Sequence, residues 1–214
     1  HQYYGLILRI MIHENREMVY SLIGIRRLEM MRMKVLNADI VDLWKQGEIV
    51  CITLSLEVRY KEMVGIIDRG NALAMGRIIP GLASLVGHCI LQKRGEVAYI
   101  TERLIAFYTK PAWDRFERGL PDEIHRYNWG HKIPGSHCIA DPVIVARSAR
   151  QLLRLVDREK PKRVYLPVPG VGDGALDVED IQEALQVLEK EPRIILVSNR
   201  HIEGRDIQMI DSPL

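Results

Sequence analysis

The chain has 214 residues, of which 47% are hydrophobic, and its 30 basic and 28 acidic residues leave a formal net charge of +2. This length supports one substantial core and is too short for two full domains with a linker. The balanced charge gives no strong nucleic-acid signal, because non-specific binding to phosphates requires a basic field. No run approaches the ~20 apolar residues of a membrane helix, so we expect no membrane partner.

The three cysteines, Cys51, Cys89 and Cys138, are an odd number. Cys51 and Cys89 lie in apolar stretches, where buried and reduced thiols are typical. The first residues do not show an apolar core followed by a small-residue cleavage site. We therefore expect a cytoplasmic protein.

A methionine-rich junction at residues 30–33 divides the chain. We interpret residues 1–32 as an N-terminal extension to which no function is assigned. Residues 33–200 then form the folded domain, and residues 201–214 form a C-terminal tail or an edge strand.

From residue 33 onward, short β-rich runs alternate with helical patterns, which is typical of an α/β domain with helices packed on a central sheet. The predicted strands are residues 35–36, 49–54, 97–100, 104–108, 164–168 and 194–198. The predicted helices are residues 71–79, 82–92, 145–156 and 178–188. Residues 109–140 have little periodicity, which predicts a long irregular loop of the kind that often serves a site.

A glycine-rich turn, Pro169-Gly170-Val171-Gly172-Asp173-Gly174, separates the fifth predicted strand from the last predicted helix. Glycines allow positive φ and close backbone approach, and a helix N-terminus favours anions, so this turn is suited to a phosphate. The alternative is an ordinary strand-to-helix turn with Asp177 as the helix cap. The spacing Gly170-x-Gly172-x-x-Ala175 also loosely matches a dinucleotide fingerprint. That motif requires a further strand with an acidic residue about 20 residues on, which is not predicted here.

The histidines do not predict a metal site. His125, His131, His137 and Cys138 lack the i,i+4 or Cys-x-x-Cys spacing of zinc ligands. The sequence also has no Gly-x-Ser-x-Gly elbow and no Gly-Lys-Ser/Thr phosphate loop, which argues against a serine hydrolase and a P-loop protein. We expect no metal and no cofactor.

Six segments carry a resemblance to a known family: residues 35–40, 49–53, 69–74, 109–113, 144–156 and 166–177. In the same order, these segments resemble the macro-domain family, in particular its bacterial and phage branch that binds or processes ADP-ribose. The resemblance implies a three-layer α/β/α fold with a central mixed sheet.

The resemblance also implies a set of ligand-binding residues. Asp39 would read the adenine amino group and the backbone at Ile40 would meet the ring, although Asp39 can instead be a helix cap. Two loops would hold the diphosphate and the distal ribose, mainly through glycines and main-chain amides. The implied set is Asp39, Ile40, Thr53, Arg69, Gly70, Asn71, Pro169, Gly170, Val171, Gly172, Gly174, Ala175 and Leu176. Arg69 can also be a solvated charge, and Gly70 a plain helix-start turn.

Three residues are candidates for catalysis. Ser55 lies nearest the position where catalytic relatives carry an asparagine, which is a departure from the family pattern. Asp68 and Asp173 are carboxylates that can act as an acid or orient a water, or can simply cap helices. Lys110 can reach an anionic ligand from the loop, or can be an exposed, solvated lysine.

We therefore expect a protein that binds ADP-ribose, a related nucleotide or an ADP-ribosylated macromolecule. As an enzyme it would be an ADP-ribosyl hydrolase or an ADP-ribose phosphate phosphatase. The alternatives are a nucleotide-binding module without turnover and a partner-binding module of a phage or defence system.

Overall fold

A computed structural model describes residues 35–117, 127–171, 174–176 and 178–198. Within these ranges six strands form a mixed sheet in the order β1-β10-β9-β2-β6-β5. The bounds are β1 Val35–Asn37, β2 Val50–Ser55, β5 Ala98–Thr101, β6 Leu104–Lys110, β9 Val164–Pro167 and β10 Ile194–Ser198. Five strands are parallel, and β5 pairs antiparallel with β6 at one edge. All six predicted strands are confirmed.

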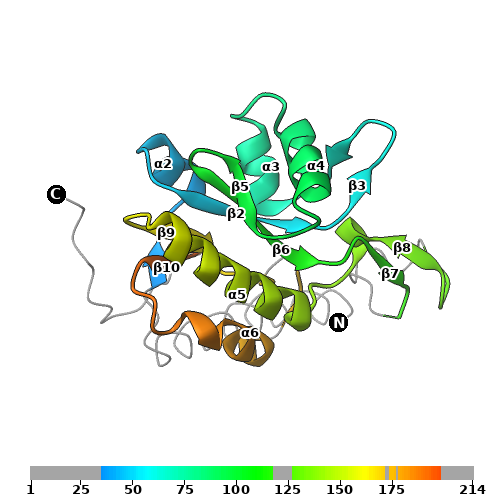
Figure 1. Cartoon of the computed structure of the whole chain (residues 1–214). Helices are drawn as coiled ribbons and strands as arrows, with labels where there is room; N and C mark the ends of the chain where they lie inside the picture. Colours follow the sequence, from blue (N-terminus) through cyan, green and yellow to red (C-terminus); the bar gives the residue numbers. More distant parts are fainter. Residues whose placement is uncertain (1–34, 118–126, 172–173, 177, 199–214) are drawn as a thin grey trace, which may run out of the picture.

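Helices cover both faces of the sheet (Figure 1). One face carries α2 (Ile40–Lys45), α3 (Gly70–Gly76) and α4 (Leu82–Gln92), and the other carries α5 (Pro142–Glu159) and α6 (Val178–Leu185), which continues into the 3-10 turn η3 (Gln186–Leu188). The predicted three-layer α/β/α architecture with a central mixed sheet is therefore confirmed. Pro142 at the first position of α5 and Asp141 at its N-cap define where this helix begins.

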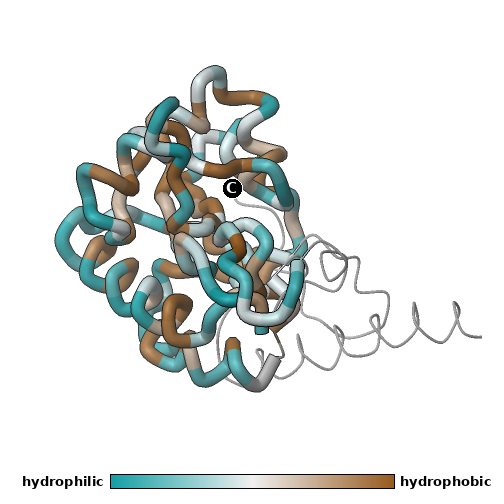
Figure 2. Tube along the Cα trace, turned by 90° about the vertical axis from the view of Figure 1, so that its right-hand side faces the viewer, coloured by the Kyte–Doolittle hydropathy of each residue, from teal (hydrophilic) through white to brown (hydrophobic). Residues whose placement is uncertain are grey.

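The core lies between the sheet and its two helical layers. The residues of β6 are buried along its whole length, as a central strand covered on both faces requires. In α5 the buried residues Val145, Ala149, Leu152 and Val156 recur every three or four positions, which confirms the predicted apolar face. Figure 2 shows hydrophobic residues concentrated along the inner strands and polar residues on the outer turns.

Two short antiparallel ribbons flank the sheet. One pairs β3 (Val58–Arg59) with β4 (Val64–Gly65), and the other pairs β7 (Trp113–Arg115) with β8 (Lys132–Pro134), which leads into the 3-10 turn η2 (Gly135–His137). The prediction of one irregular loop over residues 109–140 is therefore wrong for the described part of that segment. Strands of three residues are too short for an alternating pattern to mark them in the sequence.

No helix of the described residues is long and apolar enough to cross a membrane. The predicted N-terminal extension, residues 1–32, and the predicted tail, residues 201–214, lie outside the described residues.

Candidate functional site

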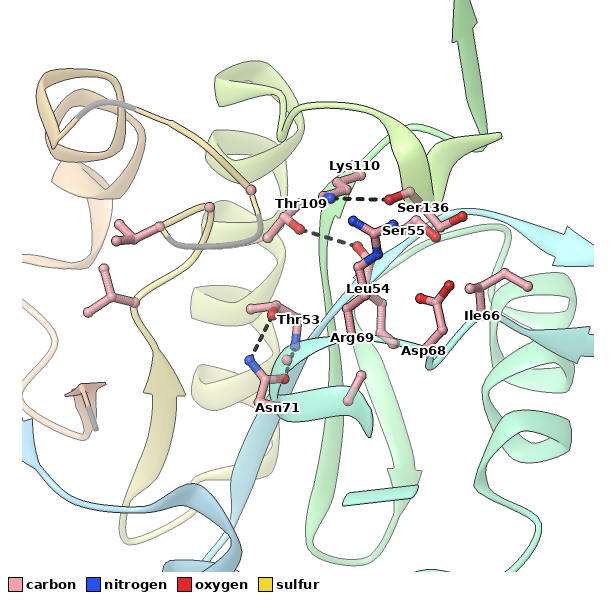
Figure 3. A pocket seen from close by; sticks show the side chains of 16 residues that line it. Thr53, Leu54, Ser55, Ile66, Asp68, Arg69, Asn71, Thr109, Lys110 and Ser136 are labelled. Atoms are coloured by element: carbon pink, nitrogen blue, oxygen red, sulfur yellow. Dashed lines mark hydrogen bonds between the residues drawn. The ribbon is translucent and has the colours of Figure 1, made fainter. Parts of the chain in front are cut away.

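A cleft of about 110 Å³ opens at the carboxyl ends of β2, β6 and β9 (Figure 3). Its walls come from these strand ends, from the loop before α3, from the turn after β9 and from η2. The lining residues are Thr53, Leu54, Ser55, Ile66, Asp68, Arg69, Gly70, Asn71, Ala72, Thr109, Lys110, Ser136, Val168, Gly170, Val171 and Gly174. The carboxyl edge is where open α/β sheets bind ligands, because the loops that follow the strands meet there.

Asn71 joins the start of α3 to the end of β2. Its Oδ1 accepts a hydrogen bond of 2.9 Å from the Thr53 backbone N–H, and its Nδ2 donates one of 2.8 Å to Thr53 Oγ1. Thr53 and Asn71, both predicted to bind the ligand, line the cleft. Their two hydrogen bonds also hold the end of β2 against the start of α3.

A β-bulge shapes the end of β6. Leu54 pairs with Tyr108, but the next residue, Ser55, pairs with Lys110, so Thr109 is an additional residue in β6. Bulges re-aim side chains and are frequent beside functional sites. Here both Thr109 and Lys110 line the cleft, and Lys110 is only 8% exposed.

Lys110 belongs to β6 and not to an irregular loop, so its expected position was wrong. The alternative that Lys110 is an exposed, solvated lysine is wrong as well, because the side chain is buried. Its Nζ donates a hydrogen bond of 3.4 Å to the Ser136 carbonyl oxygen, which ties the end of β6 to η2.

Ser55 lies at the end of β2 and is 7% exposed. Its hydroxyl is buried and has no hydrogen-bond partner among the described residues. Buried polar atoms are nearly always paired, so an unpaired hydroxyl in a cleft wall indicates a group that a ligand can satisfy.

Asp68 and Arg69 both line the cleft, directly before α3. Asp68 is exposed and Arg69 is half-buried, so the alternative of a fully solvated Arg69 does not describe its position. Gly70 follows with φ of +53°, a left-handed conformation that favours glycine. The catalytic role of Asp68 stays a prediction.

The glycine-rich turn folds back on itself. Gly170 has φ of +80°, and its carbonyl oxygen accepts a hydrogen bond of 3.0 Å from the Leu176 N–H. The Gly174 carbonyl accepts one of 2.8 Å from Ala140, just before α5. A Cβ at Gly174 would lie 2.6 Å from the Gly170 Cα, so the two glycines allow the backbone to approach itself. The predicted residues Gly172 and Asp173, and the proposed cap Asp177, lie outside the described residues.

Some predicted ligand-binding residues do not line the cleft. They are Asp39, Ile40, Pro169, Ala175 and Leu176. The Asp39 carboxylate caps α2, accepting hydrogen bonds of 2.7 Å from the Val41 N–H and 3.3 Å from the Asp42 N–H, as its alternative interpretation expects. The Ile40 side chain is buried in the core, which leaves its backbone for any ligand contact. The adenine contacts of Asp39 and Ile40 stay predictions.

The described residues contain no group of three His, Cys, Asp or Glu side chains placed to hold a metal ion. His137 Nδ1 lies 2.6 Å from the Tyr127 hydroxyl, and the Cys138 thiol donates a hydrogen bond of 3.4 Å to the Pro134 carbonyl. Burial, together with the nearby Asp114, raises the pKa of Cys138 to about 12. His125 lies outside the described residues.

The sequence did not reveal Thr109 and Ser136 as cleft residues. Thr109 reaches the cleft through the bulge, and its Oγ1 donates a 3.4 Å hydrogen bond to the Leu54 carbonyl. Ser136 is positioned by the Glu57 carboxylate, which accepts a 2.9 Å hydrogen bond from its backbone N–H. Neither a bulge nor a contact between residues 79 positions apart leaves a periodic signal in the sequence.

The sequence matches no protein-family model and no curated protein at a significant level. Solved structures with a similar fold include macrodomains. The macrodomain of Mycobacterium tuberculosis DarG is 16% identical, with a TM-score of 0.47 over 76% of this chain and 91% of that chain. The macrodomain of Thermus aquaticus DarG is 15% identical, with a TM-score of 0.49 over 77% and 96%. Thermosipho africanus DarTG in complex with ADP-ribose is 14% identical, with a TM-score of 0.48 over 81% and 42%.

Proposed function

We propose that the cleft binds the distal part of ADP-ribose or of a related nucleotide, either free or attached to a macromolecule. One observation carries the proposal: three motifs that are far apart in the sequence, residues 53–55, 68–71 and 170–174, contribute residues to one cleft at the carboxyl edge of the sheet.

The size of the cleft supports binding of a part of the nucleotide. Pockets that enclose a drug-sized ligand have volumes of about 300–1,000 Å³, whereas this cleft measures about 110 Å³. A sugar or a phosphate fits in such a space, and the base then lies outside it. Asp39 follows β1, so it lies at the same carboxyl edge of the sheet as the cleft. Because only β10 separates β1 from β9, Asp39 lies two strand spacings, about 10 Å, from the end of β9.

The charges of the lining residues are compatible with a diphosphate. Among the described residues that line the cleft, Arg69 and Lys110 are cationic and Asp68 is anionic. A net positive charge inside a concave wall attracts phosphate groups, and the main-chain N–H groups of the two glycine-containing loops can donate to them.

Hydrolysis of an ADP-ribosyl or ADP-ribose phosphate linkage is the first candidate activity. Asp68, exposed at the rim of the cleft, would orient the attacking water, and Asp173 is the second carboxylate expected nearby. The second candidate is binding without turnover. It is favoured by Ser55, whose short hydroxyl side chain stands where an asparagine amide is expected in catalytic relatives.

Isothermal titration with ADP-ribose tests the binding proposal. We expect saturable binding and no comparable binding of ribose 5-phosphate. Asp39→Ala should weaken ADP-ribose binding by about tenfold or more, because a base-reading hydrogen bond to a charged group contributes about 1.5–3 kcal/mol. No ADP-ribose binding by the wild-type chain would refute the proposed function.

The matched control for Asp39 is Asp141→Ala. Asp141 caps α5 in the same way, accepting a 2.8 Å hydrogen bond from the Val143 N–H. Both substitutions remove a helix cap and should lower stability by about 1 kcal/mol, but only Asp39→Ala should change the affinity. Turnover is then measured as release of ADP-ribose from an ADP-ribosylated substrate. Turnover that Asp68→Asn abolishes supports the hydrolase, and binding without turnover supports the module.

A further inference from the structure

Glu57 does not line the cleft, yet it holds one of the cleft walls. It follows β2 by two residues, and the Leu56 N–H between them donates a 3.1 Å hydrogen bond to the Lys110 carbonyl oxygen, which extends the pairing of β2 with β6. The Glu57 Oε2 then accepts a 2.9 Å hydrogen bond from the Ser136 backbone N–H, 79 positions further along the chain. Hydrogen bonds to a charged acceptor are stronger than those between neutral groups, so this bond is well suited to fix η2 against the end of β2.

The backbone around Ser136 is held from further sides as well. Its carbonyl oxygen accepts a 3.4 Å hydrogen bond from the Lys110 Nζ, and the neighbouring Gly135 N–H donates one of 3.0 Å to the Ala112 carbonyl oxygen. A Cβ at Gly135 would overlap the Pro111 carbonyl oxygen, so η2 lies directly against the backbone that precedes β7. Both backbone polar groups of Ser136 are therefore engaged with the protein, which leaves its hydroxyl as the polar group that it can offer to a ligand.

Ser55 provides a second hydroxyl at the same end of the cleft. Ser55 is paired with Lys110 across β2 and β6, and Lys110 bonds to Ser136, so the two serines lie beside the same lysine (Figure 3). We call this part, defined by Ser55, Lys110 and Ser136, the serine end of the cleft. The Ser55 hydroxyl is buried and has no hydrogen-bond partner among the described residues, and a buried polar group in that state is unfavourable. Hydroxyl groups of a sugar can both donate and accept, so they match this end of the cleft.

The charges at the serine end have opposite signs. Glu57 and Lys110 hold the N–H and the carbonyl oxygen of one residue, Ser136. Burial contributes most to the raised pKa of the nearby Cys138 thiol, and among the charged side chains Glu57 raises this pKa while Lys110 lowers it. A carboxylate and an ammonium thus share this part of the structure, which favours neutral hydrogen-bonding groups of a ligand there.

We propose that Glu57 is a positioning residue for the ligand. Through the Ser136 N–H it holds the Ser136 hydroxyl, together with that of Ser55, in place to bind the hydroxyl groups of the distal ribose. This inference rests on the proposed function, and it names the residues by which the cleft distinguishes ADP-ribose from ADP, which lacks that ribose. Glu57 acts only through Ser136.

Calorimetric titration with ADP-ribose and with ADP tests the positioning role. The wild-type chain should bind ADP-ribose more tightly than ADP. Glu57→Ala should weaken ADP-ribose binding by about fivefold or more, as the loss of a hydrogen bond implies, and should leave the affinity for ADP unchanged. Glu57→Gln retains an oxygen that accepts the Ser136 N–H, so it should bind ADP-ribose within about twofold of the wild-type affinity.

Gln151→Ala is the matched control. The Gln151 Oε1 accepts a 3.1 Å hydrogen bond from the Val97 backbone N–H, 54 positions away, and neither residue lines the cleft. Both alanine variants remove a part-buried hydrogen bond between a side chain and a distant backbone N–H, so both should lower the temperature of unfolding. Only Glu57→Ala should change the ratio of the ADP-ribose and ADP affinities.

Ser136→Ala separates positioning from a general loss of stability. It keeps the backbone N–H that Glu57 binds and removes only the hydroxyl, so it should reproduce the weaker binding of ADP-ribose with little change in thermal unfolding. Because Glu57 acts through Ser136, the double variant Glu57→Ala, Ser136→Ala should bind ADP-ribose about as tightly as the weaker of the two single variants.

The outcomes distinguish this inference from the proposed function. Wild-type affinity for ADP-ribose in Glu57→Ala or in Ser136→Ala, an equal loss in Glu57→Gln and Glu57→Ala, or an equal loss in Gln151→Ala overturns the positioning role and leaves ADP-ribose binding intact. If thermal unfolding shows that Glu57→Ala does not fold, Glu57→Gln and Ser136→Ala decide by the same criteria. Absence of ADP-ribose binding by the wild-type chain overturns the positioning role together with the proposed function.

Discussion

Asn71 holds Thr53 through two hydrogen bonds in opposite directions, one of 2.9 Å from the Thr53 N–H to Asn71 Oδ1 and one of 2.8 Å from Asn71 Nδ2 to Thr53 Oγ1. The pair joins Thr53, near the carboxyl end of β2, to Asn71 in the first turn of α3. Two walls of the cleft are therefore fixed relative to each other by a single side chain.

Substitution of Asn71 by alanine should destabilise the domain by about 2 kcal/mol. The change removes two part-buried hydrogen bonds and leaves the Thr53 N–H without its acceptor. Urea unfolding measures the loss. Asn128→Ala, at an exposed position, should change the free energy of unfolding by less than about 0.5 kcal/mol. Equal stabilities of the two variants would contradict the role of the pair.

Gly87→Ala should be strongly destabilising, by about 3 kcal/mol or more, because it forces the β3–β4 ribbon away from α4. A Cβ at Gly87 would overlap the Met63 carbonyl oxygen and lie 2.7 Å from its carbon, and backbone atoms cannot move aside cheaply. Gly76→Ala is the control, since its Cβ would meet at 2.6 Å only the flexible end of Ile67. Thermal unfolding should show a much smaller loss for Gly76→Ala, and similar losses would refute this packing.

Ala175→Gly should stabilise the chain by up to about 1 kcal/mol. Ala175 has φ of +51°, a left-handed conformation that is unfavourable for any residue with a Cβ. The reverse change at Gly170, where φ is +80°, should destabilise the turn and weaken nucleotide binding. Chemical denaturation should show a higher free energy of unfolding for Ala175→Gly and a lower one for Gly170→Ala. Destabilisation by Ala175→Gly would contradict the described turn.

The three cysteines should resist alkylation in the native protein at pH 8 and react fully in denaturant. Burial raises the pKa of each thiol, to about 12 for Cys138, and all three are free and buried. Because the unfolded thiols ionise near their ordinary pKa of 9.0, the stability that depends on neutral Cys138 is complete below pH 9. It is lost progressively as the pH rises toward 12. Mass spectrometry after iodoacetamide treatment counts the modified thiols, and rapid labelling of the native chain would refute the burial.

The Cys138→Ala variant isolates that pH dependence. It should lose less stability between pH 9 and pH 11 than the wild-type chain, because one thiol that ionises more readily in the unfolded state is gone. A Cys51→Ala variant changes a thiol in the main core and serves as a comparison, since Cys51 is also buried and its pKa is also raised. If the stability of Cys138→Ala depended on pH as the wild-type stability does, the raised pKa of Cys138 would not cause the loss of stability.

The sequence by itself determined the six strands of the central sheet and the helices α3, α4, α5 and α6, but not α2 or the two short ribbons. Short apolar runs mark the strands, and the repeat of Val145, Ala149 and Leu152 marks α5, because burial against a sheet requires one apolar face. The glycine-rich turn at Gly170 follows from local turn chemistry, because glycine permits a positive φ, whereas Thr53 and Arg69 were singled out only through the resemblance to macro domains.

Only the tertiary structure decided which polar side chains meet in the cleft. The bulge at Thr109 turns Lys110 into the cleft, and Glu57 places Ser136 beside it across 79 positions of sequence. The same structure shows the Asp39 carboxylate capping α2, outside the cleft. The burial and the charge of a site depend on residues that strand register and loop packing bring together. No local sequence pattern encodes which distant residues will meet.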